Sequence, residues 1–174
     1  IKTDVLIIGG GMAGVLCARL LDEQGVDCAL LEGGRIGGGT PANTTAKITS
    51  QHGLIYDRLI RDFGTERARM YLEANQRAIG AFRALADGID CAMETRPAHV
   101  YSLTSYADLL HEAKAAQALG APASVEDSVP LPLSAVGAVR FEDQAQFHPL
   151  RFLGGIARGL RIYENSFVHT LRGT

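Results

Sequence analysis

The sequence lacks the features that mark several classes of protein. It has no long uninterrupted hydrophobic run, so it offers no transmembrane helix of ordinary length. It has no basic run, and its net charge is −2 over 174 residues, so the charge pattern indicates no attraction to nucleic acid or to a membrane. The three cysteines, Cys17, Cys28 and Cys91, are an odd number without metal-site spacing and read as buried, reduced thiols. We therefore expect a soluble, cytoplasmic protein.

We do not expect the first residues of this sequence to act as a secretion signal. The first residues are apolar, but Asp4 interrupts their start and a glycine turn prevents a continuous hydrophobic segment. The apolar content of 47% is ordinary for a packed globular fold. The length indicates one domain, or one domain with an insertion.

The most informative stretch is residues 3–32, TDVLIIGGGMAGVLCARLLDEQGVDCALLE. Residues 5–8 are an unbroken apolar run, as expected of a central parallel strand that is covered on both faces. Gly9, Gly11 and Gly14 follow with G-x-G-x-x-G spacing. In a dinucleotide-binding βαβ unit, the first glycine permits the tight turn, the second lets backbone approach a pyrophosphate, and the third lets the helix pack on the strand. The start of that helix then presents N–H groups and a positive dipole end to phosphates.

The second strand of this unit ends on an acid, Glu32. Its offset from the glycines is close to that at which an acid meets the ribose hydroxyls, and such an acid disfavours a 2′-phosphate. FAD or NAD is therefore expected in preference to NADP. Gly25 suits the end of the intervening helix. The alternative is a glycine-rich loop that joins strand to helix and binds no ligand.

The extended pattern Gly9-x-Gly11-x-x-Gly14-x-x-x-Ala18 resembles the FAD fingerprint of the D-amino-acid oxidase (DAO) superfamily. Residues 35–53, RIGGGTPANTTAKITSQHG, resemble the loop after the ribose acid in bacterial DAO-type FAD-dependent oxidoreductases, particularly a subgroup that often carries a Rieske iron–sulfur domain. The resemblance implies an α/β fold: a Rossmann-like FAD-binding domain, built as a βαβ unit with a parallel sheet, and an inserted α+β segment from the substrate domain.

The same resemblance implies FAD as the cofactor and a set of residues that contact it. These are Gly9, Gly11, Met12, Ala13 and Gly14 at the pyrophosphate, Glu32 at the adenosine ribose with Gly33 beside it, Arg35, Gly39, Thr40, Thr45, Ala46 and Lys47 on the path to the isoalloxazine ring, and Val168 at the adenine. Glycines in this loop allow close backbone approach, and its threonines supply short donors and acceptors. On composition alone, a flexible surface loop without a ligand fits equally well.

We expect residues 1–88 to be FAD-binding, 89–147 to be an insertion that begins the substrate domain, and 148–174 to return to the FAD-binding domain. Helices are expected at 54–63, 65–86 and 105–119, and a last strand at 161–168. On the second of these helices, residues at three- and four-residue steps form the expected core face. They are Tyr71, Ala74, Ala78, Phe82 and Leu85.

In DAO-type enzymes a hydride passes from a carbon bearing an amine or amino-acid nitrogen to the flavin, and this sequence resembles their N-terminal portion only. We expect later strands and substrate residues to be missing, the chain alone to be inactive, and a sheet edge to be open to self-association. No catalytic residue is assigned, and His52 and Lys47 fit structural roles as well as catalytic ones. No paired Cys and His motifs of a Rieske site occur. The alternatives are an NAD-linked dehydrogenase and a non-catalytic nucleotide-binding module.

Overall fold

The computed structural model describes residues 2–172, and it divides into two compact units. The first unit comprises the described residues of Ile1–Ala46, Leu85–Ala92 and Phe147–Thr174, and the second comprises Lys47–Ala84 and Met93–Gln146. The predicted functional boundaries 1–88, 89–147 and 148–174 stay a prediction, because a compact unit need not be a functional domain. The last of these boundaries, Thr174, lies outside the described residues.

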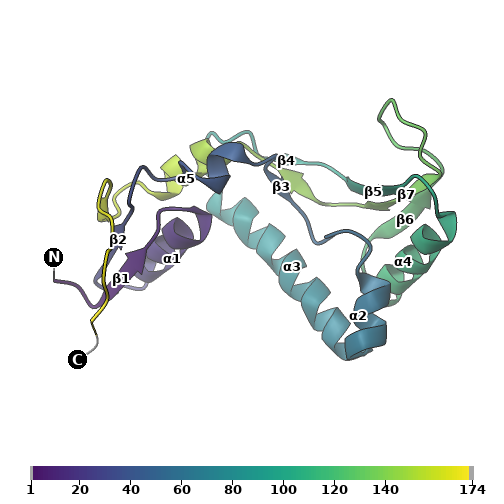
Figure 1. Ribbon diagram of the computed structural model, residues 1–174, viewed down its shortest axis with the longest axis horizontal. Coiled ribbons are helices and arrows are strands. Elements are labelled where there is room, and N and C mark those ends of the chain that lie inside the picture. Colours follow the sequence, from purple (N-terminus) through teal and green to yellow (C-terminus); the bar gives the residue numbers. More distant parts are fainter. Residues whose placement is uncertain (1, 173–174) are drawn as a thin grey trace. The chain divides into compact units, whose positions relative to one another are not determined.

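The first unit contains the βαβ unit that the sequence predicts. Strand β1 (Val5–Ile8) leads through the glycine turn into helix α1 (Met12–Glu23), and β2 (Cys28–Leu31) follows. Gly25 has a φ of +72°, in the left-handed region that ends helices. A third strand, β9 (Ile162–Tyr163), pairs in parallel with β2, so that the order is β1-β2-β9 (Figure 1). This parallel sheet places the glycine turn at the carboxyl end of β1.

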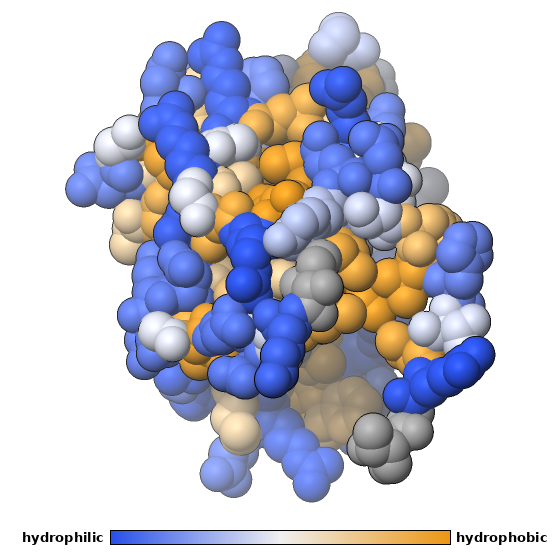
Figure 2. All heavy atoms as spheres, turned by 90° about the vertical axis from the view of Figure 1, so that its left-hand side faces the viewer, coloured by the Kyte–Doolittle hydropathy of each residue, from blue (hydrophilic) through white to orange (hydrophobic). Residues whose placement is uncertain are grey.

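The two faces of this sheet differ in how well they are covered. Helix α1 packs on β2, and both Val15 of α1 and Leu30 of β2 are fully buried. On the other face Leu6 and Ile8 remain 43% and 50% exposed. The view in Figure 2 shows apolar residues of this part of the molecule reaching the surface among charged ones. The expected burial of β1 on both faces is therefore wrong within residues 2–172, where β1 also lies at the end of the sheet. Self-association through that edge stays a prediction.

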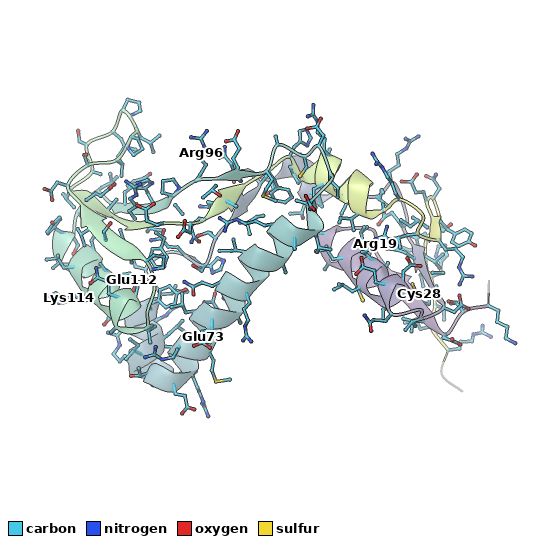
Figure 3. All side chains as sticks on the ribbon, turned by 180° about the vertical axis from the view of Figure 1, so that it is seen from behind. Arg19, Cys28, Glu73, Arg96, Glu112 and Lys114 are labelled. Atoms are coloured by element: carbon cyan, nitrogen blue, oxygen red, sulfur yellow. The ribbon has the colours of Figure 1, made fainter. Side chains whose placement is uncertain are left out.

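Helix α5 (Pro149–Ile156) packs on α1 in the same unit. It begins with proline after His148, whose Nδ1 accepts the N–H of Arg151 at 3.4 Å. It ends against Arg19 of α1, which donates from Nε at 3.1 Å and from Nη2 at 2.6 Å to the carbonyl of Ile156 (Figure 3). A cation thus satisfies a carbonyl at the negative end of the helix. The 3-10 turn η1 (Thr40–Asn43) also contacts α5.

The second unit holds two small antiparallel sheets. Strands β3 (Lys47–Ile48), β8 (Ala145–Gln146) and β4 (Glu94–Thr95) form one, in that order. The other has the order β5-β7-β6 and consists of β5 (Ala98–Ser102), β7 (Gly137–Phe141) and β6 (Ala123–Glu126). Alternate residues of β7, such as Val139 and Phe141, point to the helical side and are fully buried.

Three helices cover that face: α2 (Tyr56–Phe63), α3 (Thr65–Leu85) and α4 (Tyr106–Ala118). The predicted core face of α3 is wrong. Tyr71, Ala74 and Ala78 are exposed, and the buried residues of the helix are Ala68, Leu72 and Ile79. The buried line lies next to the predicted one, because Tyr71 turns its hydroxyl to Nδ1 of His52 at 2.9 Å and so stays at the surface.

The last strand is shorter than predicted. The sequence predicts extended structure over residues 161–168, but β9 ends at Tyr163. Asn165 has a φ of +51°, a left-handed conformation that breaks the strand. The chain then bends back over the end of β2, where Ser166 donates its N–H to the carbonyl of Glu32 at 2.8 Å.

Candidate dinucleotide-binding site

Each of the three fingerprint glycines meets a different local demand. Gly9 has a φ of +106°, and its N–H donates to the carbonyl of Leu31 at 2.8 Å. A Cβ on Gly14 would lie 1.9 Å from the carbonyl oxygen of Gly9, so only glycine allows α1 to start this close to the strand. A Cβ on Gly11 would meet nothing within 4 Å. The space in front of Gly11 is therefore open to an approaching group.

The start of α1 has no side-chain cap. Gly11 occupies the N-cap position and cannot accept from the first turn, whereas Ser105 caps α4 by accepting the N–H of Asp108 at 3.2 Å. The first N–H groups of a helix have no partner within the helix, and the helix dipole makes this end positive. Open space and unpaired donors together fit a pyrophosphate.

Glu32 lies directly after β2 and faces the turn. Its Oε2 accepts the N–H of Gly10 at 2.7 Å, and its Oε1 accepts the N–H of Gly34 at 2.8 Å. These bonds, first that from Gly34 and then that from Gly10, lower the pKa of Glu32 from its ordinary value. The group therefore stays ionised at neutral pH. A carboxylate has about four acceptor positions, so it keeps capacity for ribose hydroxyls.

The lowered pKa of Glu32 predicts a pH dependence of stability. A carboxyl whose pKa is lower in the folded than in the unfolded state stabilises the fold above the unfolded pKa, and this contribution is lost as the pH falls through the folded pKa. The variant Glu32→Gln should therefore be less stable than the unchanged protein at about pH 7, with a smaller gap at about pH 3. Urea unfolding of both proteins at the two pH values measures this, and a gap that is equal at both would contradict it.

Gly10 belongs to the site although the fingerprint leaves its position free. Its N–H is bound by Glu32, and its carbonyl accepts the N–H of Gly37 at 2.9 Å. A Cβ here would lie 2.9 Å from Cγ2 of Ile36. The glycine turn is thus clamped through both polar groups of Gly10 by the segment 32–37. The only sequence signal is that a glycine stands at a position that the pattern leaves free.

The remaining predicted residues lie in three places. Gly33 is covered by Phe167, whose Cδ2 would be 2.9 Å from a Cβ at this position, and Val168 follows in the same stretch, half-buried. Arg35 is exposed, and its backbone carbonyl accepts the N–H of Gly38 at 3.1 Å. The others follow along the chain: Gly39 and Thr40 at the start of η1, Thr45 and Ala46 after it, and Lys47 as the first residue of β3 in the second unit.

The predicted site residues differ in how directly they contact the glycine turn. Glu32 contacts it directly, and Gly33 follows Glu32 in the chain. Gly39 makes local contacts, accepting from the N–H of Ala42 at 3.1 Å and from Nδ2 of Asn43 at 3.0 Å. Ala46 is 8% exposed and has a φ of +55°. Cofactor contacts at every predicted residue, those of the glycine turn and of Glu32 included, stay predictions.

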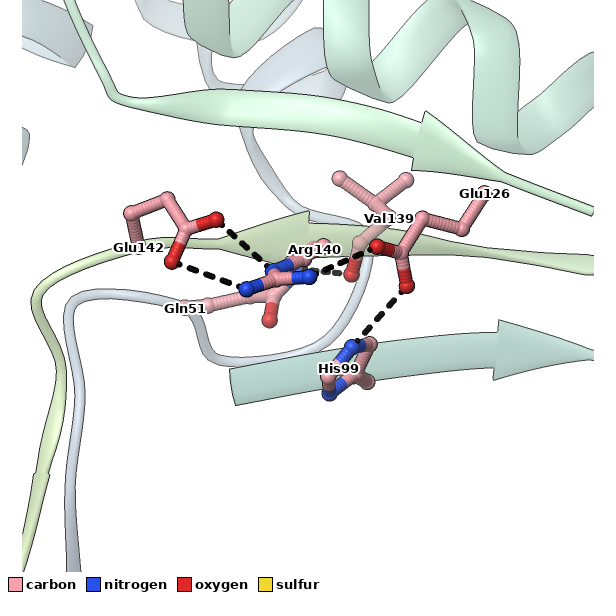
Figure 4. Close-up of polar contacts among 6 residues, drawn as sticks. All are labelled: Gln51, His99, Glu126, Val139, Arg140 and Glu142. Carbon is pink, nitrogen blue, oxygen red and sulfur yellow. Dashed lines mark hydrogen bonds and ion pairs between the residues drawn. The ribbon is translucent and has the colours of Figure 1, made fainter. Parts of the chain in front are cut away.

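A polar cluster in the second unit holds four titratable side chains, those of His99, Glu126, Arg140 and Glu142. Arg140 of β7 pairs with Glu126 of β6 at 2.9 Å and with Glu142 at 2.8 Å, and Glu126 also contacts Nε2 of His99 at 3.1 Å (Figure 4). The bond from Arg140 lowers the pKa of Glu126. An open cavity of about 710 Å³ adjoins these residues. Because the charged groups are paired with one another across three strands, the cluster fits a structural role.

Residues 2–172 contain no candidate metal centre and no candidate membrane-spanning helix. No group of His, Cys, Asp or Glu side chains there could hold a metal ion. In the same part of the chain, every helix is too short or too polar to traverse a bilayer. The predicted cytoplasmic location stays a prediction.

Comparison with known proteins identifies the family. Residues 4–174 match the family described as FAD dependent oxidoreductase (DAO). The chain therefore belongs to the DAO family of FAD-dependent oxidoreductases, a group defined by its flavin cofactor, and the resemblance drawn from the glycine fingerprint is confirmed. One relative is the putative Rieske 2Fe-2S iron-sulfur protein YhfW of Bacillus subtilis (strain 168). It is 40% identical over 174 residues, which cover 95% of this chain and 34% of YhfW.

Solved structures confirm the α/β fold. Glycine oxidase from Bacillus cereus superposes with a TM-score of 0.72 at 21% identity, over 99% of this chain and 49% of that one. L-proline dehydrogenase from P. horikoshii gives a TM-score of 0.75 at 16% identity, over 94% of this chain and 44% of that one. At these identities the likeness concerns the fold alone. The chain spans about a third of the length of YhfW and less than half of each solved chain.

Proposed function

We propose that this chain forms the dinucleotide-binding part of an FAD-dependent oxidoreductase that oxidises a C–N bond of an amine or amino acid. The observation that carries the proposal is the glycine turn itself. Gly11 faces open space, α1 starts without a side-chain cap, and the ionised Glu32 stands beside both. Such a site suits the pyrophosphate and the ribose of a dinucleotide.

Different residues of the first unit would bind different parts of the dinucleotide. The N–H groups at the start of α1 would take the pyrophosphate, with Arg35 as an exposed cation able to approach it. Glu32 would accept from ribose hydroxyls and repel a 2′-phosphate. When bound, FAD supplies the two-electron oxidation chemistry, and the protein supplies position and electrostatics.

The substrate class is supported by the family and by the names of its neighbours. Glycine oxidase and L-proline dehydrogenase share the fold, and their names specify amino-acid substrates. We propose amino acids or related amines as substrates of a whole protein in which the present residues are one part. We also propose that these residues alone turn over no amine, because they span less than half of each solved chain that they match.

The first test is the visible absorption spectrum of the purified chain, before and after incubation with FAD and removal of unbound cofactor. We expect a retained flavin band, with the variant Arg35→Ala losing part of it and the exposed Arg67→Ala of the second unit retaining it. A chain that binds NADH and excludes FAD would contradict the proposal and favour an NAD-linked dehydrogenase. Amine oxidation by the FAD-loaded chain alone would contradict the inactivity.

A further inference from the structure

A second carboxylate, that of Glu164, binds the segment 32–36, which also contacts the glycine turn. Oε1 of Glu164, the residue after β9, accepts the N–H of Ile36 at 2.8 Å. The left-handed turn at Asn165 then brings two more donors to the same stretch of chain. The N–H of Asn165 donates to the carbonyl of Gly34 at 2.9 Å, and that of Ser166 to the carbonyl of Glu32 at 2.8 Å. Residues 164–166 thus make three hydrogen bonds to residues 32–36.

The other side of residues 32–37 is the side that holds the glycine turn. Glu32 and Gly37 bind the two polar groups of Gly10, and the side chain of Ile36 occupies the space where Gly10 would carry a Cβ. Ile36 therefore stands between Glu164 and the turn, bound through its N–H on one side and packed through its side chain on the other. All of these residues lie in the first unit.

We propose that Glu164 is a positioning residue of the dinucleotide site, which holds Ile36 and, through it, the glycine turn. This rests on the proposed function, because the site it positions is the one we propose for the adenosine diphosphate half of FAD. Glu164 acts through the backbone of Ile36 and takes no part in binding itself. A bond from an N–H to an ionised carboxylate is about twice as strong as a neutral one, so the contact can set the conformation of an exposed loop.

Glu164 is itself exposed, so its replacement should leave the fold intact. The alternative is a surface contact that fixes the end of β9 and has no effect on the turn. The two differ in what happens at Gly10, which Glu164 does not touch. A loss of order that stays at residues 164–166 fits the alternative, and one that reaches Gly10 fits the proposal.

The test compares amide hydrogen exchange in the unchanged chain, Glu164→Ala and Glu164→Gln, without ligand. We expect Glu164→Ala to speed exchange about tenfold at Ile36 and to speed it at Gly10 as well, while amides of α3 stay unchanged. Glu164→Gln should fall between the unchanged chain and Glu164→Ala, because its amide oxygen still accepts the N–H but the bond is no longer charge-assisted. Glu23→Ala, at the exposed end of α1, is the matched control. Unchanged exchange at Gly10 in Glu164→Ala would overturn the proposal.

A titration with FAD adds a functional readout. We expect Glu164→Ala to bind FAD about fivefold to tenfold more weakly, with Glu164→Gln in between and Glu23→Ala close to the unchanged chain. Equal affinity in all four proteins would overturn the positioning role and leave the proposed function intact. Failure of the unchanged chain to bind FAD would count against the proposed function, and the exchange experiment would still decide the role of Glu164.

Discussion

Replacing Gly14 by alanine should abolish or severely weaken dinucleotide binding and destabilise the first unit. The new Cβ would lie 1.9 Å from the carbonyl oxygen of Gly9, a backbone atom that cannot rotate away. Either α1 moves off the sheet or the turn at Gly9 changes its conformation. Overpacking of this kind costs about 3 kcal/mol, which would be about a hundredfold in Kd if all of it fell on binding.

The matched control is Gly154→Ala. Gly154 also lies inside a helix of the first unit, α5, but a Cβ there would meet nothing within 4 Å. Alanine is favoured over glycine in a helix by about 1 kcal/mol, so this variant should be as stable as the unchanged chain or more so. Urea unfolding and FAD titration of both variants separate the steric clash at residue 14 from the general effect of alanine in a helix. A Gly14→Ala protein with unchanged stability and affinity would contradict the packing described here.

Replacing Glu112 by alanine should unfold or strongly destabilise the second unit. Glu112 of α4 is 1% exposed, and its carboxylate accepts the N–H groups of Ile55 at 2.8 Å, Tyr56 at 2.9 Å and Asp57 at 3.0 Å (Figure 3). It therefore caps α2 from another helix, since Ile55 in the N-cap position has no acceptor of its own. Leaving buried N–H groups unpaired costs roughly 1–3 kcal/mol each, so we expect a loss of about 3 kcal/mol or more.

Two further variants test this assignment. Glu112→Gln keeps one acceptor oxygen but turns an NH2 group toward the remaining N–H. Its stability should fall between that of the unchanged chain and that of Glu112→Ala. Glu73→Ala removes an exposed acid from α3 and should change stability by less than about 0.5 kcal/mol. Tyrosine fluorescence during urea unfolding reports mainly on this unit, which contains Tyr56, Tyr71, Tyr101 and Tyr106. Equal midpoints for Glu112→Ala and Glu73→Ala would refute the capping role.

The sequence predicts the parts of the site that depend on local backbone geometry. Gly9, Gly11 and Gly14 act within a few residues of one another, so their spacing carries the turn and the start of α1. Glu32 is also predictable, because the length of the helix and the second strand fixes where it emerges. The structure adds that its carboxylate accepts the N–H of Gly10, a contact that the spacing alone does not predict.

The sequence does not predict contacts that come from distant segments. Glu164 is 128 residues from Ile36, and no spacing rule links the two. The face of α3 was mispredicted for a related reason. The apolar residues Tyr71 and Leu72 are neighbours, and a helical period alone cannot decide which of them points inward. Packing against α2 and α4 buries Leu72, and the hydrogen bond to His52 holds Tyr71 at the surface.

The pairing of β2 with β9 also determines the order in which the molecule can fold. Leu30 and Ile162 are partners in the sheet although the whole second unit lies between them in the chain. During synthesis all residues of the second unit, which end at Gln146, are made before β9. Closing so long a loop is slow, and proteins with such distant contacts fold slowly. The first part of the chain to be made is therefore expected to be the last to acquire its native structure.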